Sequence, residues 1–403
     1  MVLLTACVVR RYFVTLLVMH VCHICDSSLQ GDYFRNIANG LTRKGVRVSL
    51  VELGPGKPPT WLAEFPGVTY RSLEAAGKKQ YPLAVRRLAR FLKGEKVDIL
   101  HTHLFYSGLI GVLTKRLGSR SVVALMRHHT SVVRMLGSRF HVKADKWMAE
   151  KADHVLSVSN AAKAYMLDVD GIRRDDIEVV HLGFDFEQLA SNAEDRERLR
   201  AEFGFADDDL VIGYVANFAH GKGHIQLIEA FKKISAEIPN ARLIFAGRGE
   251  IAEVNEAAAK FPAGKIVFAG WQNDIAAFLN AMDIFVQPSL SEAFSQVIME
   301  AMGVGLPVVA TNVGGASEVI VSGENGVLIE PNDVAAISYE VVRLSRNPEL
   351  LLRLGAAGRK TVTANFTAEQ MVERQFELYK KWLDLQAGNA GALACVPRVS
   401  RHW

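Results

Sequence analysis

Two glutamates that stand eight positions apart are the residues of this chain best suited to chemistry. Glu292 follows Pro288 and two serines, and Glu300 follows an apolar run that includes Val297 and Ile298. The apolar residues recur at helical spacing, which predicts a helix that begins between the two acids. One carboxylate would then lie just before a helix N-terminus, and the other two turns inside the helix.

The start of this predicted helix is a candidate anion site. The first backbone N–H groups of a helix have no partner within it, and they carry the positive end of its dipole. Here those groups belong to Phe294, Ser295, Gln296 and Val297. A phosphate held there would suit a sugar nucleotide, with one acid for sugar hydroxyls and the other for ribose hydroxyls. The alternative is a pair of solvated glutamates, because acids are favoured near helix starts.

The residues around the two acids form an ordered series. A strand-like run at 283–287 precedes them, and a turn and strand at 303–311, a glycine loop at 312–318 and Asn-Gly-Val-Leu at 325–328 follow. This series closely resembles the signature of the retaining glycosyltransferases of the GT-B fold, specifically family 4, with its two glutamates separated by seven residues. The resemblance extends over roughly residues 19–385.

The resemblance implies a fold and a reaction. The fold is α/β, with two doubly wound Rossmann-like domains that face each other across a cleft, where ligands bind by default. A sugar would move from a UDP- or GDP-sugar to an acceptor hydroxyl with retention of configuration, without metal or other cofactor. Glu292 would hold the sugar hydroxyls and Glu300 the ribose, while Lys222 and the N–H groups at 294–297 would stabilise the diphosphate.

His129 is the second candidate catalytic residue. It follows the predicted strand 121–126, and sites of α/β proteins gather at the carboxyl ends of parallel strands. The family has a histidine followed by Thr or Ser here, which contacts the transferred sugar, and His129 fits this order better than His128. The alternative is a capping or packing histidine. His101 and His103 end a neighbouring predicted strand and are weaker candidates for the acceptor side.

The predicted diphosphate loop departs from the family pattern at one position. Lys222 lies between two glycines after a predicted strand, where its ammonium can reach a diphosphate unobstructed. The family has an arginine a few residues earlier, where this chain has Asn217. The donor diphosphate would then have one cation fewer. Arg248, in a Gly-Arg-Gly loop, is a candidate to supply a second one.

Two further donor contacts are implied. Gly31 matches a glycine loop after the first strand that lets backbone approach the donor phosphate, although Gln30 replaces the first of the two family glycines. Trp271 follows the predicted strand 266–270 at the place where family members bind the base, and a core or edge tryptophan is equally consistent.

The composition and the charge distribution limit the classes of partner that this chain is expected to bind. The chain has 403 residues, of which 22% are charged, which predicts a globular protein of two domains. Residues 1–190 carry 27 Lys and Arg against 17 Asp and Glu, whereas the remainder carries 20 against 26. The basic first half suits an anionic lipid surface or a lipid-linked, phosphorylated or glycan acceptor. No interleaved aromatic and basic motif supports nucleic-acid binding.

A predicted amphipathic helix at 83–94 is the clearest basic surface. Its outward positions would be Arg86, Arg87, Arg90 and Lys93, and its inward positions Leu83, Leu88, Phe91 and Leu92. A solvated face is one interpretation and membrane contact the other. Because Arg10 and Arg11 split the apolar start into pieces too short to span a bilayer, a cytoplasmic location is expected, with attachment to the inner membrane face as the alternative.

Two short motifs carry less weight. Cys22 and Cys25 form a C-x-x-C, but no second pair completes a zinc site, and packing at a strand is expected. Asp168 and Asp170 form a D-x-D in a helix-like stretch far from the two glutamates, where no metal role is expected.

The domain boundaries follow from these elements. We predict a first, acceptor-side domain at 1–187 that includes an N-terminal extension at 1–11 and a first strand at 16–23. The run 182–185 ends the last strand of this domain, a polar, charged linker follows it to about residue 200, and a nucleotide-sugar domain covers 188–365. A helix at 366–386, begun by a Thr367–Gln370 capping box, would cross back to the first domain, and 387–403 would be a loose tail. Two other functions stay open: a different sugar-nucleotide enzyme such as an epimerase, or a degenerate binding subunit.

Overall fold

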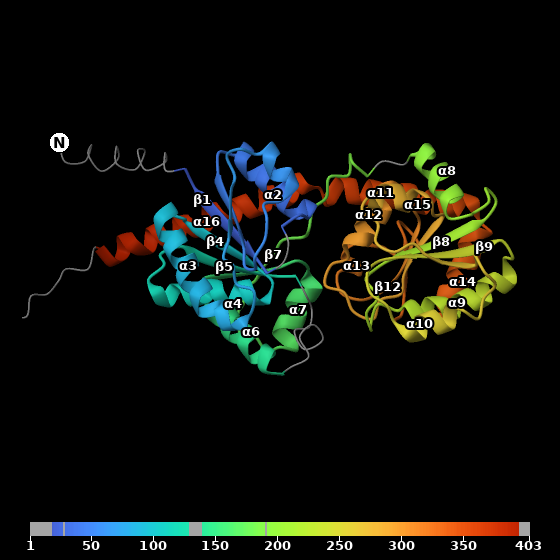
Figure 1. Cartoon of the computed structure of the whole chain (residues 1–403), viewed down its shortest axis with the longest axis horizontal. Coiled ribbons are helices and arrows are strands. Elements are labelled where there is room, and N and C mark those ends of the chain that lie inside the picture. Colours follow the sequence, from blue (N-terminus) through green and yellow to red (C-terminus); the bar gives the residue numbers. More distant parts are fainter. Residues whose placement is uncertain (1–17, 27–28, 129–138, 190–191, 395–403) are drawn as a thin grey trace, which may run out of the picture.

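The computed structural model describes residues 18–26, 29–128, 139–189 and 192–394. Two α/β domains lie side by side, and helices cover both faces of a parallel sheet in each (Figure 1). The predicted pair of doubly wound domains is therefore confirmed.

The first sheet has seven parallel strands in the order β3-β2-β1-β4-β5-β6-β7. Their bounds are β1 His20–Cys25, β2 Arg47–Glu52, β3 Thr69–Ser72, β4 Ile99–His103, β5 Val122–Arg127, β6 His154–Ser157 and β7 Glu178–Val179. The α-helices around it are α2 Asp32–Arg43, α3 Tyr81–Glu95, α4 Phe105–Thr114, α6 Arg139–Lys151 and α7 Asn160–Asp168. The 3₁₀ turns are η2 Thr60–Glu64, η3 Lys78–Gln80 and η4 Lys115–Leu117. The strand order reverses between β1 and β4, which makes this a topological switch point.

The second sheet has six parallel strands in the order β10-β9-β8-β11-β12-β13, with its switch point between β8 and β11. The strands are β8 Leu210–Val215, β9 Ala241–Ala246, β10 Ile266–Phe268, β11 Ile284–Gln287, β12 Val308–Thr311 and β13 Val327–Ile329. The helices are α8 Ala193–Glu202, α9 His224–Glu237, α10 Ala252–Ala258, α11 Ile275–Asn280, α12 Gln296–Val304, α13 Ala316–Val319, α14 Val334–Ser345 and α15 Pro348–Asn365.

Helix α16, Ala368–Ala394, returns from the second domain to pack on α2 of the first (Figure 1). The predicted capping box is confirmed, because the Gln370 side chain accepts from the Thr367 N–H at 3.0 Å and the Thr367 hydroxyl accepts from the Gln370 N–H at 3.2 Å. Tyr379 and Trp382 are fully buried. The predicted loose tail is wrong for 387–394, which are helical, and its remainder lies outside the described residues.

Three other sequence predictions need correction. The first strand begins at His20 rather than at residue 16, and the extension at 1–11 lies outside the described residues. The predicted linker contains a helix, α8. Its Arg200 is buried and donates to the carbonyls of Ala206 and Asp209, so this charged side chain packs inside the second domain and is not part of a solvated loop. Leu83 is 43% exposed, because α3 turns Ala84 and Val85 inward instead.

The two chain crossings between the domains meet at one point. The Phe184 N–H donates to the Phe366 carbonyl at 3.0 Å, and the Ala368 N–H donates back to the Phe184 carbonyl at 2.9 Å. Gly183 has no room for a side chain, since a Cβ there would lie 2.3 Å from the Thr367 carbonyl oxygen. Close backbone approach therefore requires glycine at this crossing.

A carboxylate of the second domain binds a helix start of the first. Glu318 accepts from the Asn160 and Ala161 N–H groups at the start of α7, at 3.0 and 2.9 Å, and it contacts His181 Nε2 at 2.8 Å. Burial alone would raise the pKa of Glu318, but the hydrogen bonds from His181, Asn160 and Ala161 outweigh it and lower the pKa to about 2. The two domains are thus joined by a charged contact as well as by the chain crossings.

The described part of the chain contains no helix with the length and apolar character needed to cross a bilayer. Cys22 and Cys25 are buried in β1, as their expected packing role requires. Asp170 of the D-x-D pairs with the buried guanidinium of Arg127.

Candidate active site

A cavity of about 520 Å³ lies between the two domains. It opens at the carboxyl ends of β1 and β4 in the first sheet and of β8 and β11 in the second, so both switch points face it. Its lining contains Cys25, Tyr33, Phe34, His103, Leu104, His128, Leu182, Tyr214, Val215, Ala216, Asn217, Lys222, Gln287, Glu292, Phe294, Ser295, Gln296 and Val297. Seven of the predicted catalytic and donor-binding residues are in this list, and so is His103, one of the two acceptor-side candidates.

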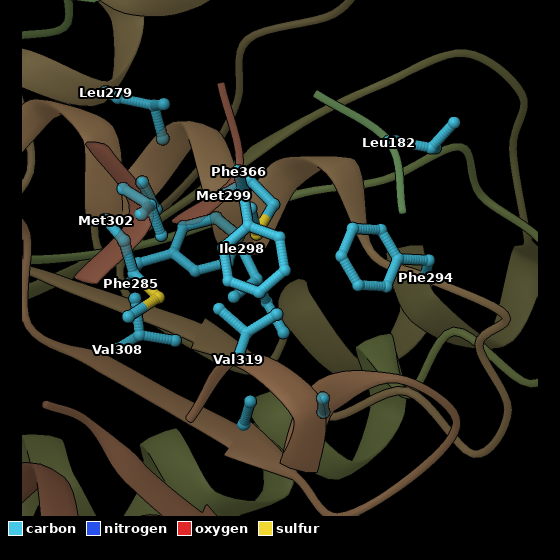
Figure 2. Close-up of a cluster of buried hydrophobic side chains, with 14 of the residues drawn as sticks. Leu182, Leu279, Phe285, Phe294, Ile298, Met299, Met302, Val308, Val319 and Phe366 are labelled. Atoms are coloured by element: carbon cyan, nitrogen blue, oxygen red, sulfur yellow. The ribbon is translucent and has the colours of Figure 1, made fainter. Parts of the chain in front are cut away.

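Helix α12 presents its N-terminus to the cavity. Ser295 is the N-cap, and its hydroxyl accepts from the Ile298 N–H at 3.4 Å. The helix is anchored through its apolar face, where Ile298, Met299 and Met302 enter the cluster of buried side chains in Figure 2. The first-turn N–H groups are therefore held in place by the core, and the residues that carry them line the cavity as predicted.

Lys222 and Glu292 meet at this helix start. Lys222 Nζ lies 2.7 Å from Glu292 Oε1, and the Ser289 hydroxyl donates to the same oxygen at 2.8 Å. The glycine after the lysine is required, because Gly223 has φ +78° and a Cβ there would lie 2.0 Å from the Pro288 carbonyl oxygen. The lysine loop is therefore pressed against the glutamate loop, which brings a cation and a carboxylate to one wall of the cavity.

The Glu292 loop is also held from the opposite side. Gly314 has φ +57°, and a Cβ there would lie 1.9 Å from the Glu292 carbonyl oxygen. The Gly315 N–H and the Ser159 hydroxyl of the first domain both donate to the Ala293 carbonyl, at 3.0 and 2.7 Å. The backbone of the Glu292 loop is thus fixed by both domains.

Glu300 lies within α12 and does not line the cavity. Burial, with a smaller contribution from the charge of Asp32, raises the pKa of Glu300 to about 7. Asp32 is the first residue of α2, and Gly31 is the N-cap before it, with open space where a side chain would be. Gly31 and Glu300 are therefore placed beside the cavity rather than on its wall.

The three predicted donor contacts that follow β8, β9 and β10 are arranged differently from one another. Asn217 lines the cavity, and its side-chain oxygen accepts from the Arg248 N–H at 3.1 Å. The Arg248 guanidinium stacks over the Trp271 ring at 4.0 Å from its centroid, and neither residue lines the cavity. Trp271 is 52% exposed. In this structure, then, the Arg248 cation is not directed at the diphosphate site.

His129 lies outside the described residues, so its predicted role is not tested by the structure. The neighbouring His128 lines the cavity, and so does His103. His101 is buried below them, with its Nδ1 hydrogen-bonded to the Tyr379 hydroxyl of α16. Of the two acceptor-side candidates, His103 is therefore at the cavity and His101 is not.

Four histidine rings form a stack that runs from the cavity lining, at His128 and His103, into the first domain, at His23 and His101. His128 Nε2 contacts His103 Nδ1 at 3.0 Å, and His103 Nε2 contacts His23 Nδ1 at 2.9 Å. Burial lowers the pKa of His128 to about 4 and that of His23 to about 3, and it lowers the pKa of His101 and His103 well below the usual value. These rings are therefore neutral at pH 7.

Three of these histidines also have the spacing of a metal-ligand group, since one nitrogen of each of His23, His101 and His103 lies within 4.8 Å of the others. However, both nitrogens of His103 already contact other rings. The three ring planes are inclined by only 18–32° to one another, so their in-plane lone pairs do not converge on one point. The geometry is that of stacked neutral imidazoles.

Tyr214 and Gln287 are among the polar residues on the cavity wall that sequence reasoning missed. The Tyr214 hydroxyl donates to the Lys222 carbonyl at 2.8 Å and lies 3.0 Å from Ser289 Oγ. Gln287 ends the apolar strand β11, and its Oε1 accepts from Ser295 at 2.6 Å. Both stand in strands that read as core. The signal available for Gln287 was an amide at the end of an otherwise apolar strand, directly before Pro288.

Two family models match the chain. "Glycosyltransferase Family 4" matches residues 30–188, and "Glycosyl transferases group 1" matches residues 195–361. The chain is similar to the N-acetyl-alpha-D-glucosaminyl L-malate synthase of Bacillus anthracis, at 27% identity over 78% of this chain and 83% of the relative. It is also similar to the UDP-Gal:alpha-D-GlcNAc-diphosphoundecaprenol alpha-1,3-galactosyltransferase of Escherichia coli, at 26% identity over 72% and 77%.

The fold has close counterparts among solved structures. The crystal structure of HepE from Anabaena in complex with UDP and glucose matches with a TM-score of 0.77 at 19% identity, and the match covers 90% of this chain and 99% of that one. The two matched models divide at the same place as the two sheets, and the cavity lies between them. The chain therefore belongs to the family 4 (group 1) glycosyltransferases of the GT-B fold.

Proposed function

We propose that this glycosyltransferase moves a hexosyl unit from a nucleotide-sugar donor to a hydroxyl acceptor with retention of configuration. The observation that carries the proposal is the Lys222–Glu292 pair at the N-terminus of α12, on the wall of the interdomain cavity. A cation and a set of first-turn N–H groups suit the diphosphate, and a carboxylate beside them suits sugar hydroxyls.

The residues would act as follows. When the donor binds, Lys222 gives up its contact with Glu292 and contacts the donor diphosphate instead. Together with the N–H groups of Gln296 and Val297, it stabilises the negative charge that develops on the diphosphate as the sugar leaves. Glu292 is then free to accept from sugar hydroxyls, while Ser289 continues to orient it. The leaving phosphate accepts the acceptor's proton on the face from which the sugar departs, which retains the configuration. Glu300 binds the ribose hydroxyls.

We also propose that the reaction needs no metal ion, since Lys222 and the helix start supply positive charge where a metal otherwise would. The acceptor would be a lipid-linked, phosphorylated or glycan hydroxyl in polysaccharide, lipopolysaccharide or glycolipid assembly. The Escherichia coli relative, whose name gives a UDP-sugar and a diphosphoundecaprenol acceptor, supports this assignment.

A thermal-shift panel of UDP, GDP, ADP and their sugars, with and without EDTA, tests the donor. We expect one nucleoside diphosphate to stabilise the protein, and the shift to survive EDTA. Glu300→Ala should weaken that nucleotide about 10–100-fold, because a hydrogen bond to a charged group contributes about 1.5–3 kcal/mol. Glu292→Gln is the matched control and should retain nucleotide affinity. Absence of any shift with the wild type would favour a degenerate subunit.

The stereochemistry is tested by donor hydrolysis followed by proton NMR. With an α-linked sugar nucleotide, the first sugar released should be the α-anomer. Initial release of the β-anomer would exclude retention, and recovery of an epimerised sugar would favour the epimerase alternative.

We propose that α3 faces an anionic membrane. Arg86, Arg90 and Lys93 are exposed on it, and the exposed Leu83 adds an apolar group to the same helix. The wild type should sediment with vesicles containing anionic phospholipid at low salt and not with phosphatidylcholine vesicles. Triple replacement of the three cations by serine should abolish sedimentation without changing nucleotide affinity. Equal sedimentation of both proteins would place the contact elsewhere.

A further inference from the structure

The Gln287 side chain is buried with half of its amide unused. It is 2% exposed, and its Nε2 has no hydrogen-bond partner among the described residues. A buried donor without a partner costs about 1–3 kcal/mol, and such groups are uncommon in folded proteins. An amide kept in this state on the wall of a ligand cavity is suited to a partner that the ligand brings.

Neighbouring contacts determine which end of the amide is free. The Ser295 hydroxyl accepts from the Ile298 N–H, so its own proton is available to donate, and Gln287 Oε1 accepts it at 2.6 Å. The amide oxygen is therefore held toward the N-cap of α12. The NH₂ group, with two protons, is left for another acceptor.

The position of Gln287 indicates the chemistry of that acceptor. Gln287 shares the cavity wall with Lys222 and Glu292 and is bonded to the N-cap of the helix whose first turn faces the cavity. The Lys222 ammonium and the N-terminus of α12 both favour an anionic oxygen in this part of the cavity, whereas Glu292 does not. Asn217, which has no charge, and Arg248, which stacks on Trp271, leave Lys222 as the one lysine or arginine among the described residues that line the cavity.

We propose that Gln287 Nε2 donates to the phosphate of the donor that adjoins the transferred sugar, and thereby compensates in part for the uncharged residue at position 217. This inference rests on the proposed function and adds a specificity-determining residue to it. The sugar-side phosphate is the one assigned because Gln287 and Glu292 share the cavity wall, whereas Glu300, assigned to the ribose, lies off it.

The test compares nucleoside diphosphate with monophosphate. Isothermal titration of wild type and Gln287→Met with UDP and UMP, and with GDP and GMP, isolates the contribution of the second phosphate. We expect Gln287→Met to weaken the preferred diphosphate about tenfold or more and the monophosphate less than about twofold. Gln287→Glu, which keeps the size and adds a negative charge, should weaken the diphosphate further. Gln226→Met, at a half-buried glutamine of the same domain outside the cavity, should change neither affinity.

A purely structural amide that ties β11 to α12 predicts a different outcome. Gln287→Met would then lower the melting temperature and weaken diphosphate and monophosphate equally, which would overturn the inference. So would an unchanged preference for diphosphate over monophosphate in Gln287→Met and Gln287→Glu, with the proposed function left standing. If the wild type binds no nucleotide in the series, the proposed function and this inference fail together.

Discussion

Replacing Lys222 by methionine should lower kcat by about 10²–10³-fold, because loss of one donor that stabilises charge in the transition state has an effect of this size. The ammonium now contacts Glu292 at 2.7 Å and stands on the cavity wall beside the α12 N-terminus. Its side chain is 32% exposed and lies in a loop, so the fold should survive. Sugar transfer, or donor hydrolysis if no acceptor is known, gives the rate, and thermal melting checks the fold.

The control for this experiment is Lys233→Met, at an exposed lysine of α9, which should leave the rate unchanged. Glu292→Ala should also suppress turnover, since it removes the proposed sugar contact and leaves Lys222 without its present partner. The two losses should not add fully in the double variant, because the residues contact each other. A Lys222→Met enzyme with nearly wild-type kcat would refute the assignment of this cavity as the active site.

Acidification from pH 7.5 to 5.5 should lower the free energy of unfolding by about 4 kcal/mol. Five of the buried histidines (His23, His101, His103, His128 and His224) have pKa values strongly lowered by burial, so below pH 6.5 the unfolded chain binds protons that the folded chain does not. Because of that difference, the free energy of unfolding decreases as the pH is lowered. For the five groups together the decrease between pH 7.5 and pH 5.5 is about 7 kcal/mol. Glu300 and Asp145 have pKa values raised to about 7 and about 6, so the folded chain binds protons at these carboxyls before the unfolded chain does. This stabilises the folded state on acidification by about 3 kcal/mol and offsets part of the loss.

Urea unfolding at pH 7.5, 6.5 and 5.5 measures this dependence. His23→Phe keeps a ring in the stack but cannot titrate. The free energy of unfolding of this variant should therefore decrease less steeply on acidification, with a slope that corresponds to about one proton fewer per molecule. His220→Ala, at an exposed histidine, should leave the slope unchanged. A wild-type stability that is flat over this range would show that the stacked rings protonate readily in the folded state.

The family resemblance predicted that Lys222 and Glu292 share a site, and the fold supplies the physical reason, because each lies in a loop after a strand of the same parallel sheet. Side-chain contacts were not predictable in this way. Arg248 and Trp271 are both exposed, and their stacking depends on the rotamers that the two side chains adopt. This stacking directs the Arg248 guanidinium away from the diphosphate position that the sequence suggested for it.

The histidine stack shows a second limit. His23 stands opposite His101 only because β1 and β4 pair in that register, and Tyr379, which bonds His101, comes from 278 positions further along the chain. Periodicity indicates which face of a strand is buried, but not which residue of another strand or helix lies beside it. The orphaned amide of Gln287 likewise follows from the N-cap geometry of a neighbouring helix.

The return of α16 to the first domain has a consequence for the order of synthesis. The residues that cover the first sheet's histidines, Gln375 and Tyr379 among them, leave the ribosome only after the whole second domain has been made. The domain translated first therefore cannot complete its packing first, although domains usually fold in the order of their synthesis. Until α16 has been synthesised, the nascent chain leaves uncovered the surface of α2 on which α16 packs and the His154 ring on which Trp382 stacks, and incompletely packed domains of this kind are prone to aggregation.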